Sequence, residues 1–64
     1  MMNPFAEFNE GDSVVIQDVA SLNDRARAFV GQTGCVSTVH EGYLRVEFGL
    51  FDIVYVTTDA VDTA

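Results

Sequence analysis

Lysine and tryptophan are absent from this 64-residue sequence, and only three arginines oppose its ten acidic residues. The formal net charge is therefore −7. Proteins that bind the phosphate backbone of nucleic acids use clustered lysine and arginine, whose contacts release counterions. The composition thus argues against direct binding to DNA or RNA, and it favours a protein partner, a cationic ligand or imitation of a polyanion.

Long apolar segments and paired cysteines are missing as well. The longest apolar runs span three or four residues, as at positions 53–56, whereas a membrane-spanning helix needs about 20. Residues 1–4 contain no base and begin no apolar stretch, so we expect no signal peptide. The one cysteine cannot form an internal disulfide, and the sequence shows neither a Cys/His cluster nor an export signal, so we expect a cytoplasmic chain. The short apolar runs lead us to expect no membrane contact.

The composition is nevertheless that of a folded protein. An apolar fraction of 48% is normal for a globular chain, and 64 residues allow one domain. Pro4 and two phenylalanines among polar neighbours predict an irregular N-terminal arm over residues 1–9, with Phe5 or Phe8 packed onto the body. Residues 10–64 should form the single domain.

Alternating and β-branched segments predict strands at residues 13–17, 33–39, 43–48 and 53–56. A helical turn and a short last strand should follow near residues 57–61. The close spacing of the turn signals favours an all-β fold, and at this length a small five-stranded barrel. The residues expected to face its core are Val14, Ile16, Val36, Val39, Leu44, Val46, Phe48 and Val61.

Residues 18–32 are the longest segment between predicted strands and should form a loop with a short helical turn. Ser21 is expected to cap this turn, and Phe29 or Val30 to anchor the loop on the body. A tight connection should follow the second strand, where Gly42 can adopt a positive φ without steric cost.

Three short motifs carry a resemblance to a known family. They are GDSVVI at residues 11–16, GQTGCV at residues 31–36 and VEF at residues 46–48. In this order they resemble the SH3-like small barrels of the KOW type, which read G-D-x-V-x-V, G-x-x-G-x-V and V-x-F. The resemblance implies an SH3-like barrel with a long loop after its first strand. Many members of the family bind RNA or proteins, and others are small subunits docked on redox enzymes.

Cys35 and His40 are the residues best suited to catalysis or metal binding. Cys35 is expected to be a small buried hydrophobe in the second strand, and His40 an exposed residue of the following turn. A general base needs a positioned nucleophile and an orienting partner, and the spacing implies neither. A Cys35–His40 pair is the alternative. We predict no catalytic residue, no metal site and no cofactor, and hence no enzyme.

Aromatic and acidic residues are concentrated in the hairpin predicted for residues 41–55. Exposed aromatics on a small domain are typical contact anchors, and surrounding acids would steer a basic partner toward them. The predicted partner-binding residues are the aromatics Tyr43, Tyr55 and Phe51 with an acidic rim of Glu41, Glu47 and Asp52. The alternative is that these aromatics only cover the ends of a small core.

Two functions fit this acidic surface. The first is a non-enzymatic interaction module that docks on a larger protein with a basic surface and modulates it. The alternative is an inhibitor of the phage or plasmid type, which imitates nucleic acid and occupies the DNA- or RNA-binding site of an enzyme. The class of protein that the chain binds would distinguish them.

Overall fold

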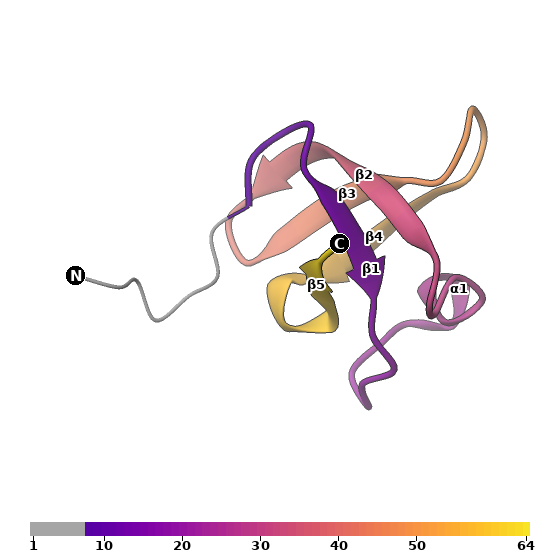
Figure 1. The fold of residues 1–64 in the computed structure, drawn as a ribbon. Coiled ribbons are helices and arrows are strands. Elements are labelled where there is room, and N and C mark those ends of the chain that lie inside the picture. The colour runs from indigo at the N-terminus through magenta and orange to yellow at the C-terminus, as the bar shows by residue number, and fades with distance from the viewer. Residues whose placement is uncertain (1–7) are drawn as a thin grey trace.

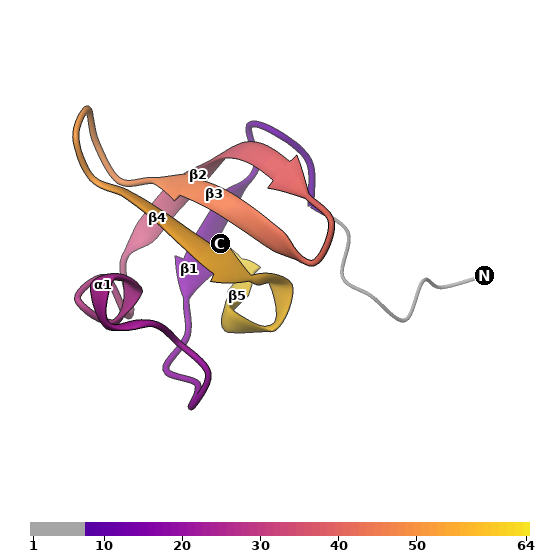
Figure 2. The same cartoon turned by 180° about the vertical axis from the view of Figure 1, so that it is seen from behind.

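A computed structural model describes residues 8–64, which fold into one sheet of five antiparallel strands with little helix (Figures 1 and 2). The elements are β1 (Ser13–Ile16), α1 (Asp24–Arg27), β2 (Thr33–His40), β3 (Tyr43–Glu47), β4 (Ile53–Thr57), the 3-10 turn η1 (Thr58–Ala60) and β5 (Val61–Thr63). The predicted β fold, its five strands and the helical turn after the first strand are confirmed. The strand order is β4-β3-β2-β1-β5, and the sheet is open in the described part of the chain, with β4 and β5 at its edges.

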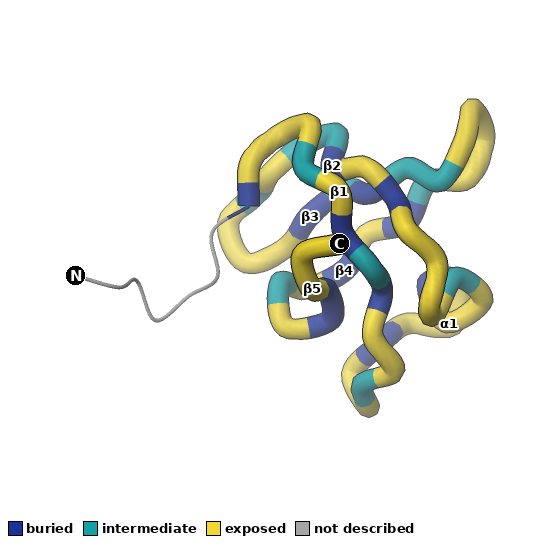
Figure 3. The backbone as a smooth tube through the Cα atoms, viewed as in Figure 1, coloured by how far each residue is buried: buried dark blue, intermediate teal, exposed yellow. Residues whose placement is uncertain are grey.

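The core is built by apolar side chains from every strand and both short helices, and buried positions alternate with exposed ones along the strands (Figure 3). The buried side chains are Phe8, Val14, Ile16, Leu22, Ala26, Val36, Leu44, Val46, Val54, Val56, Ala60 and Val61. They include all the predicted core residues except Val39 and Phe48. Phe8 packs on the body as expected, and Phe5 lies outside the described residues.

Phe48 lies partly buried at the margin of this core. Its ring stacks on that of Phe29, with centroids 4.5 Å apart and planes inclined by 17°. This contact confirms Phe29 as an anchor of the long loop. Val30, the alternative anchor, keeps 37% of its surface exposed and forms an isolated parallel bridge with Ile16.

A β-bulge in β2 decides which of its residues face inward. Val36 pairs with Val46, but the register shifts by one residue before Thr38, which pairs with Arg45. Because of this shift, Val36 and Val39 share one face although they are three residues apart. Val39 is nevertheless 41% exposed, so its predicted place in the core is wrong. It lies near the end of the strand, beside an exposed turn.

The expectation that Cys35 is buried is also wrong, because its side chain is exposed. The two neighbours of this residue, Gly34 and Val36, are the buried ones. Since successive residues of a strand point to opposite faces, Cys35 must lie on the outer face, where it pairs with Glu47.

The helix α1 begins two residues later than predicted. Its N-cap is Asn23, whose side-chain oxygen accepts a hydrogen bond from the backbone N–H of Ala26 at 2.8 Å. The predicted cap, Ser21, lies in an exposed turn before it. Asparagine and serine cap equally well, so the tertiary contacts of Asn23 decide between them.

The same segment covers the free edge of β4. The side-chain amide of Asn23 donates to the carbonyl oxygen of Tyr55 at 2.7 Å, and Nε of Arg25 donates to that of Ile53 at 2.9 Å. Unpaired carbonyls on an edge strand are open to pairing with other chains. The loop therefore protects this edge with side-chain donors.

We expect Asn23→Ala to lower the free energy of unfolding by about 1–2 kcal/mol, since it removes a helix cap and a hydrogen bond to the sheet edge. Ser21→Ala, at the position first expected to be the cap, should change it by less than about 0.5 kcal/mol. Urea unfolding of both variants measures the difference. Equal effects would contradict the assignment of Asn23 as the cap.

Candidate functional site

Three aromatic side chains form a row across the outer face of the sheet, which we call the tyrosine face: His40, Tyr43 and Tyr55. His40 and Tyr43 are a cross-strand pair of β2 and β3, with rings stacked 4.5 Å apart at 8°. The Tyr55 ring from β4 lies 6.1 Å from that of Tyr43, tilted by 59°. The tyrosines remain 40% and 53% exposed, so their predicted outward orientation is confirmed.

His40 does not occupy the exposed turn that the sequence suggested. It is the last residue of β2, and it lies half-buried against Tyr43. The strand runs one residue further than predicted, and its last residue pairs with Tyr43. Cys35 lies near the other end of β2, so the structure does not bring together the two residues of the alternative Cys35–His40 site.

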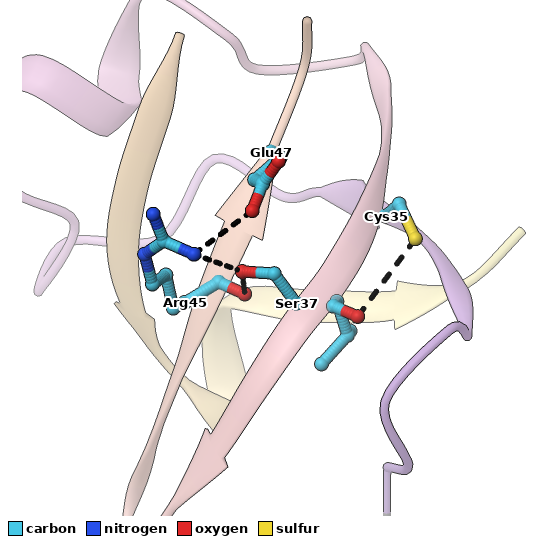
Figure 4. A network of polar contacts seen from close by, with 5 residues as sticks. Cys35, Ser37, Arg45 and Glu47 are labelled. Carbon is cyan, nitrogen blue, oxygen red and sulfur yellow. Dashed lines mark hydrogen bonds and ion pairs between the residues drawn. The ribbon is translucent and has the colours of Figure 1, made fainter. Parts of the chain in front are cut away.

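Figure 4 shows a polar network that includes Ser37, Arg45 and Glu47, and Arg45 is the cross-strand neighbour of Tyr55. Nη1 of Arg45 donates to Oγ of Ser37 at 3.0 Å and pairs with Oε2 of Glu47 at 2.8 Å. The Ser37 hydroxyl donates in turn to the carbonyl oxygen of Arg45 at 3.1 Å, which ties the bulge of β2 to β3. A partner would therefore compete with Arg45 for the carboxylate of Glu47, a residue predicted for the acidic rim.

The other two predicted rim acids are exposed at opposite ends of the hairpin. Glu41 lies in the tight turn before Tyr43, where Gly42 has the predicted positive φ of 84°. Asp52 is the last residue of the loop between β3 and β4, and its carbonyl oxygen accepts a hydrogen bond from the backbone N–H of Phe48 at 2.8 Å.

Phe51, the third predicted aromatic anchor, is distant from the tyrosines along the hairpin. Tyr43 is the first residue of β3. The five residues of this strand span roughly 14 Å before the loop begins. Phe51 lies in that loop, which projects from the body between β3 and β4 (Figures 1 and 2). Its neighbour there is Leu50, which is not among the predicted partner-binding residues. The sequence feature that could have indicated Leu50 is the presence of two adjacent large apolar residues in a predicted turn.

All three arginines make contacts within the domain. Arg25 bonds to the β4 edge, Arg27 pairs with Asp18 at 3.3 Å, and Arg45 pairs with Glu47. Within residues 8–64 no other acid takes part in an ion pair. The acids of that range left uncompensated are Glu10, Asp12, Asp24, Glu41, Asp52, Asp59 and Asp62. The surface therefore carries a strong negative field, and each arginine side chain makes at least one contact within the domain.

No group of three or more His, Cys, Asp or Glu side chains within residues 8–64 could hold a metal ion. In the same range, no polar or charged side chain is buried. The described helices include none that is long and apolar enough to cross a membrane. No family model, no characterised protein and no solved structure matches this chain.

Proposed function

We propose that this chain is a small acidic interaction module that docks on a larger, basic-surfaced protein and modulates it without catalysing a reaction. The observation that carries the proposal is the exposed tyrosine pair on the β3–β4 hairpin. Tyrosines supply large contact areas and lose little conformational entropy on binding, so they are frequent anchors of interfaces.

The charge distribution supports a basic partner. The arginines are engaged within the domain, while acids such as Glu41 beside Tyr43 are exposed. Such a field accelerates association with a cationic surface and opposes contact with a phosphate backbone. We therefore expect a cytoplasmic protein partner and no direct binding of nucleic acid or membrane.

The order of elements supports a specific fold for this module, a KOW-like SH3-like barrel. A long loop with α1 separates β1 from β2, a tight turn joins β2 to β3, a longer loop joins β3 to β4, and η1 leads to β5. This is the arrangement that the sequence motifs imply. The strand β5 returns to pair with β1 at the edge of the sheet opposite to β4.

A second candidate function follows from the uncompensated acids. Their spread over the domain favours an inhibitor that imitates nucleic acid and occupies the DNA- or RNA-binding site of an enzyme. In that case oligonucleotides should displace the chain from its partner. A docking module on a structural or metabolic protein should be indifferent to them.

Affinity capture from the native host, at low and high salt, identifies the partner. Association and dissociation rates with the purified partner then test whether the tyrosine face makes the contact. Tyr43→Ala should weaken binding by about 1–3 kcal/mol, mainly through faster dissociation. Val39→Ala is the matched control, because Val39 is equally exposed, at 41% against 40%, but lies on the opposite face. Glu41→Lys should slow association, and less so as salt rises.

Wild-type kinetics for Tyr43→Ala, with unchanged circular dichroism, would contradict a contact at the tyrosine face. If Val39→Ala weakens partner binding and Tyr43→Ala does not, the interface lies on the other side of the sheet. Absence of any salt-sensitive protein partner would remove the docking proposal itself.

A further inference from the structure

We propose that the loop between β3 and β4 ends in an apolar plug, formed by Leu50 and Phe51, that inserts into an apolar pocket of the protein partner. This inference rests on the proposed docking function and specifies the shape and chemistry of the surface that the module recognises. We call these two residues the hairpin tip.

The exposure of the hairpin tip is the first observation. Leu50 is 89% exposed and Phe51 86%, whereas the other large exposed apolar residues of the described chain reach 53% at most. Single exposed apolar side chains are ordinary on protein surfaces. Two adjacent ones at the end of a projecting hairpin form a knob that only a concave partner surface can cover.

The support beneath the tip is the second observation. The hairpin stem consists of five consecutive cross-strand pairs, from Tyr43 with Thr57 to Glu47 with Ile53. A backbone hydrogen bond of 2.8 Å from Phe48 to Asp52 closes its end. A knob held on such a stem is preorganised, so little of its freedom remains to be lost on binding.

Charge selects a protein pocket over a lipid surface or a second copy of the chain. The charged residue directly beside the tip is an acid, Asp52, which has no ion pair within residues 8–64. Further along the stem, Glu47 is paired with Arg45, and Arg25 bonds to the carbonyl oxygen of Ile53. Anionic headgroups attract basic segments and repel a protein of net charge −7. Two such chains also repel each other, so self-association through their tips is disfavoured. An apolar pocket with lysine or arginine at its rim complements the apolar tip, the adjacent Asp52 and the net negative charge of the chain.

The tip cannot carry the interface alone. A stable interface buries roughly 800 Å² on each partner, and a phenylalanine supplies about 150–250 Å². The remaining contact is available on the same hairpin, where the outer face presents Tyr43 and Tyr55. In this proposal the partner contacts the hairpin along its outer face and binds the tip in an apolar pocket.

Binding kinetics with the captured, purified partner test the plug. The double variant Leu50→Ser/Phe51→Ser should raise the dissociation rate tenfold or more, whereas Phe51→Leu, which keeps an apolar side chain, should stay within about threefold of the wild type. All variants should keep the urea midpoint of the wild type, because the tip contributes nothing to the core. A photo-crosslinker at position 51 should attach to aliphatic or aromatic residues of the partner, with lysine or arginine nearby.

The outcomes separate the two proposals. If Tyr43→Ala weakens binding and the tip variants do not, the plug is wrong and docking by the tyrosine face stands. If neither weakens binding, both proposals fail. Two further experiments test the other possible occupants. Flotation with phosphatidylglycerol and phosphatidylcholine vesicles tests membrane binding, and sedimentation of the chain alone tests self-association. Vesicle binding or self-association that the double variant abolishes would overturn the protein pocket in favour of a membrane or a second copy.

Discussion

Val46→Asp is expected to leave the chain unfolded at room temperature. Val46 has no exposed surface and lies in the middle of the core, where an aspartate would find no partner for its charge. Burying an unpaired carboxylate and losing the valine contacts should cost more than about 4 kcal/mol. A domain of 64 residues has a total stability of about 3–10 kcal/mol, so little or no folded protein should remain.

Val39→Asp is the matched control for this experiment. It adds the same charge to a valine of the inner face of the sheet, but at a position that is 41% exposed. Its aspartate can stay hydrated, so we expect a folded protein with a loss of at most about 1 kcal/mol. Circular dichroism and urea unfolding compare the two variants. A folded Val46→Asp protein would refute the core assignment.

Gly34→Val should be the second most damaging substitution, lowering the free energy of unfolding by at least about 3 kcal/mol. A Cβ atom at Gly34 would lie 2.7 Å from Cγ1 of Val46 and 2.7 Å from Cε1 of Phe48. Neither group can retreat easily, because Val46 is fully buried and Phe48 is stacked on Phe29. The γ-methyl groups of valine would add to the overlap.

Cys35→Val introduces the same side chain at the next residue, on the outer face. Valine favours strands and has open space there, so we expect a change within about 0.5 kcal/mol. Thermal unfolding of both variants tests the contrast. Similar melting temperatures would mean that Val46 and Phe48 do not pack over Gly34.

The alternation of residues in the strands explains most of what could be predicted about the fold. Leu44 and Val46 are buried and Tyr43 is exposed, as the two-residue period of β3 requires. That period also implies that Cys35 faces outward once Val36 faces inward. The prediction for Cys35 failed because the general tendency of free cysteines to be buried was given more weight than the local pattern.

The candidate site was predictable in its residue types and only partly in its arrangement. The sequence indicates that Tyr43 and Tyr55 lie on one hairpin, and the structure brings their rings within 6.1 Å. It separates Phe51 from them and pairs Glu47 with Arg45. Both differences depend on where the strands end and on side-chain contacts across the sheet, which a one-dimensional pattern does not contain.

The excess of acids, the inward face of β3 and the turn at Gly42 follow from the amino-acid sequence alone, because composition, side-chain alternation and backbone freedom are local properties. The bulge in β2, the exposure of Val39 and the cap at Asn23 follow instead from contacts made in the folded chain. Asn23 is the cap because its amide also reaches the carbonyl of Tyr55, 32 residues away. Such choices depend on contacts between distant segments, which form only when the whole sheet is assembled.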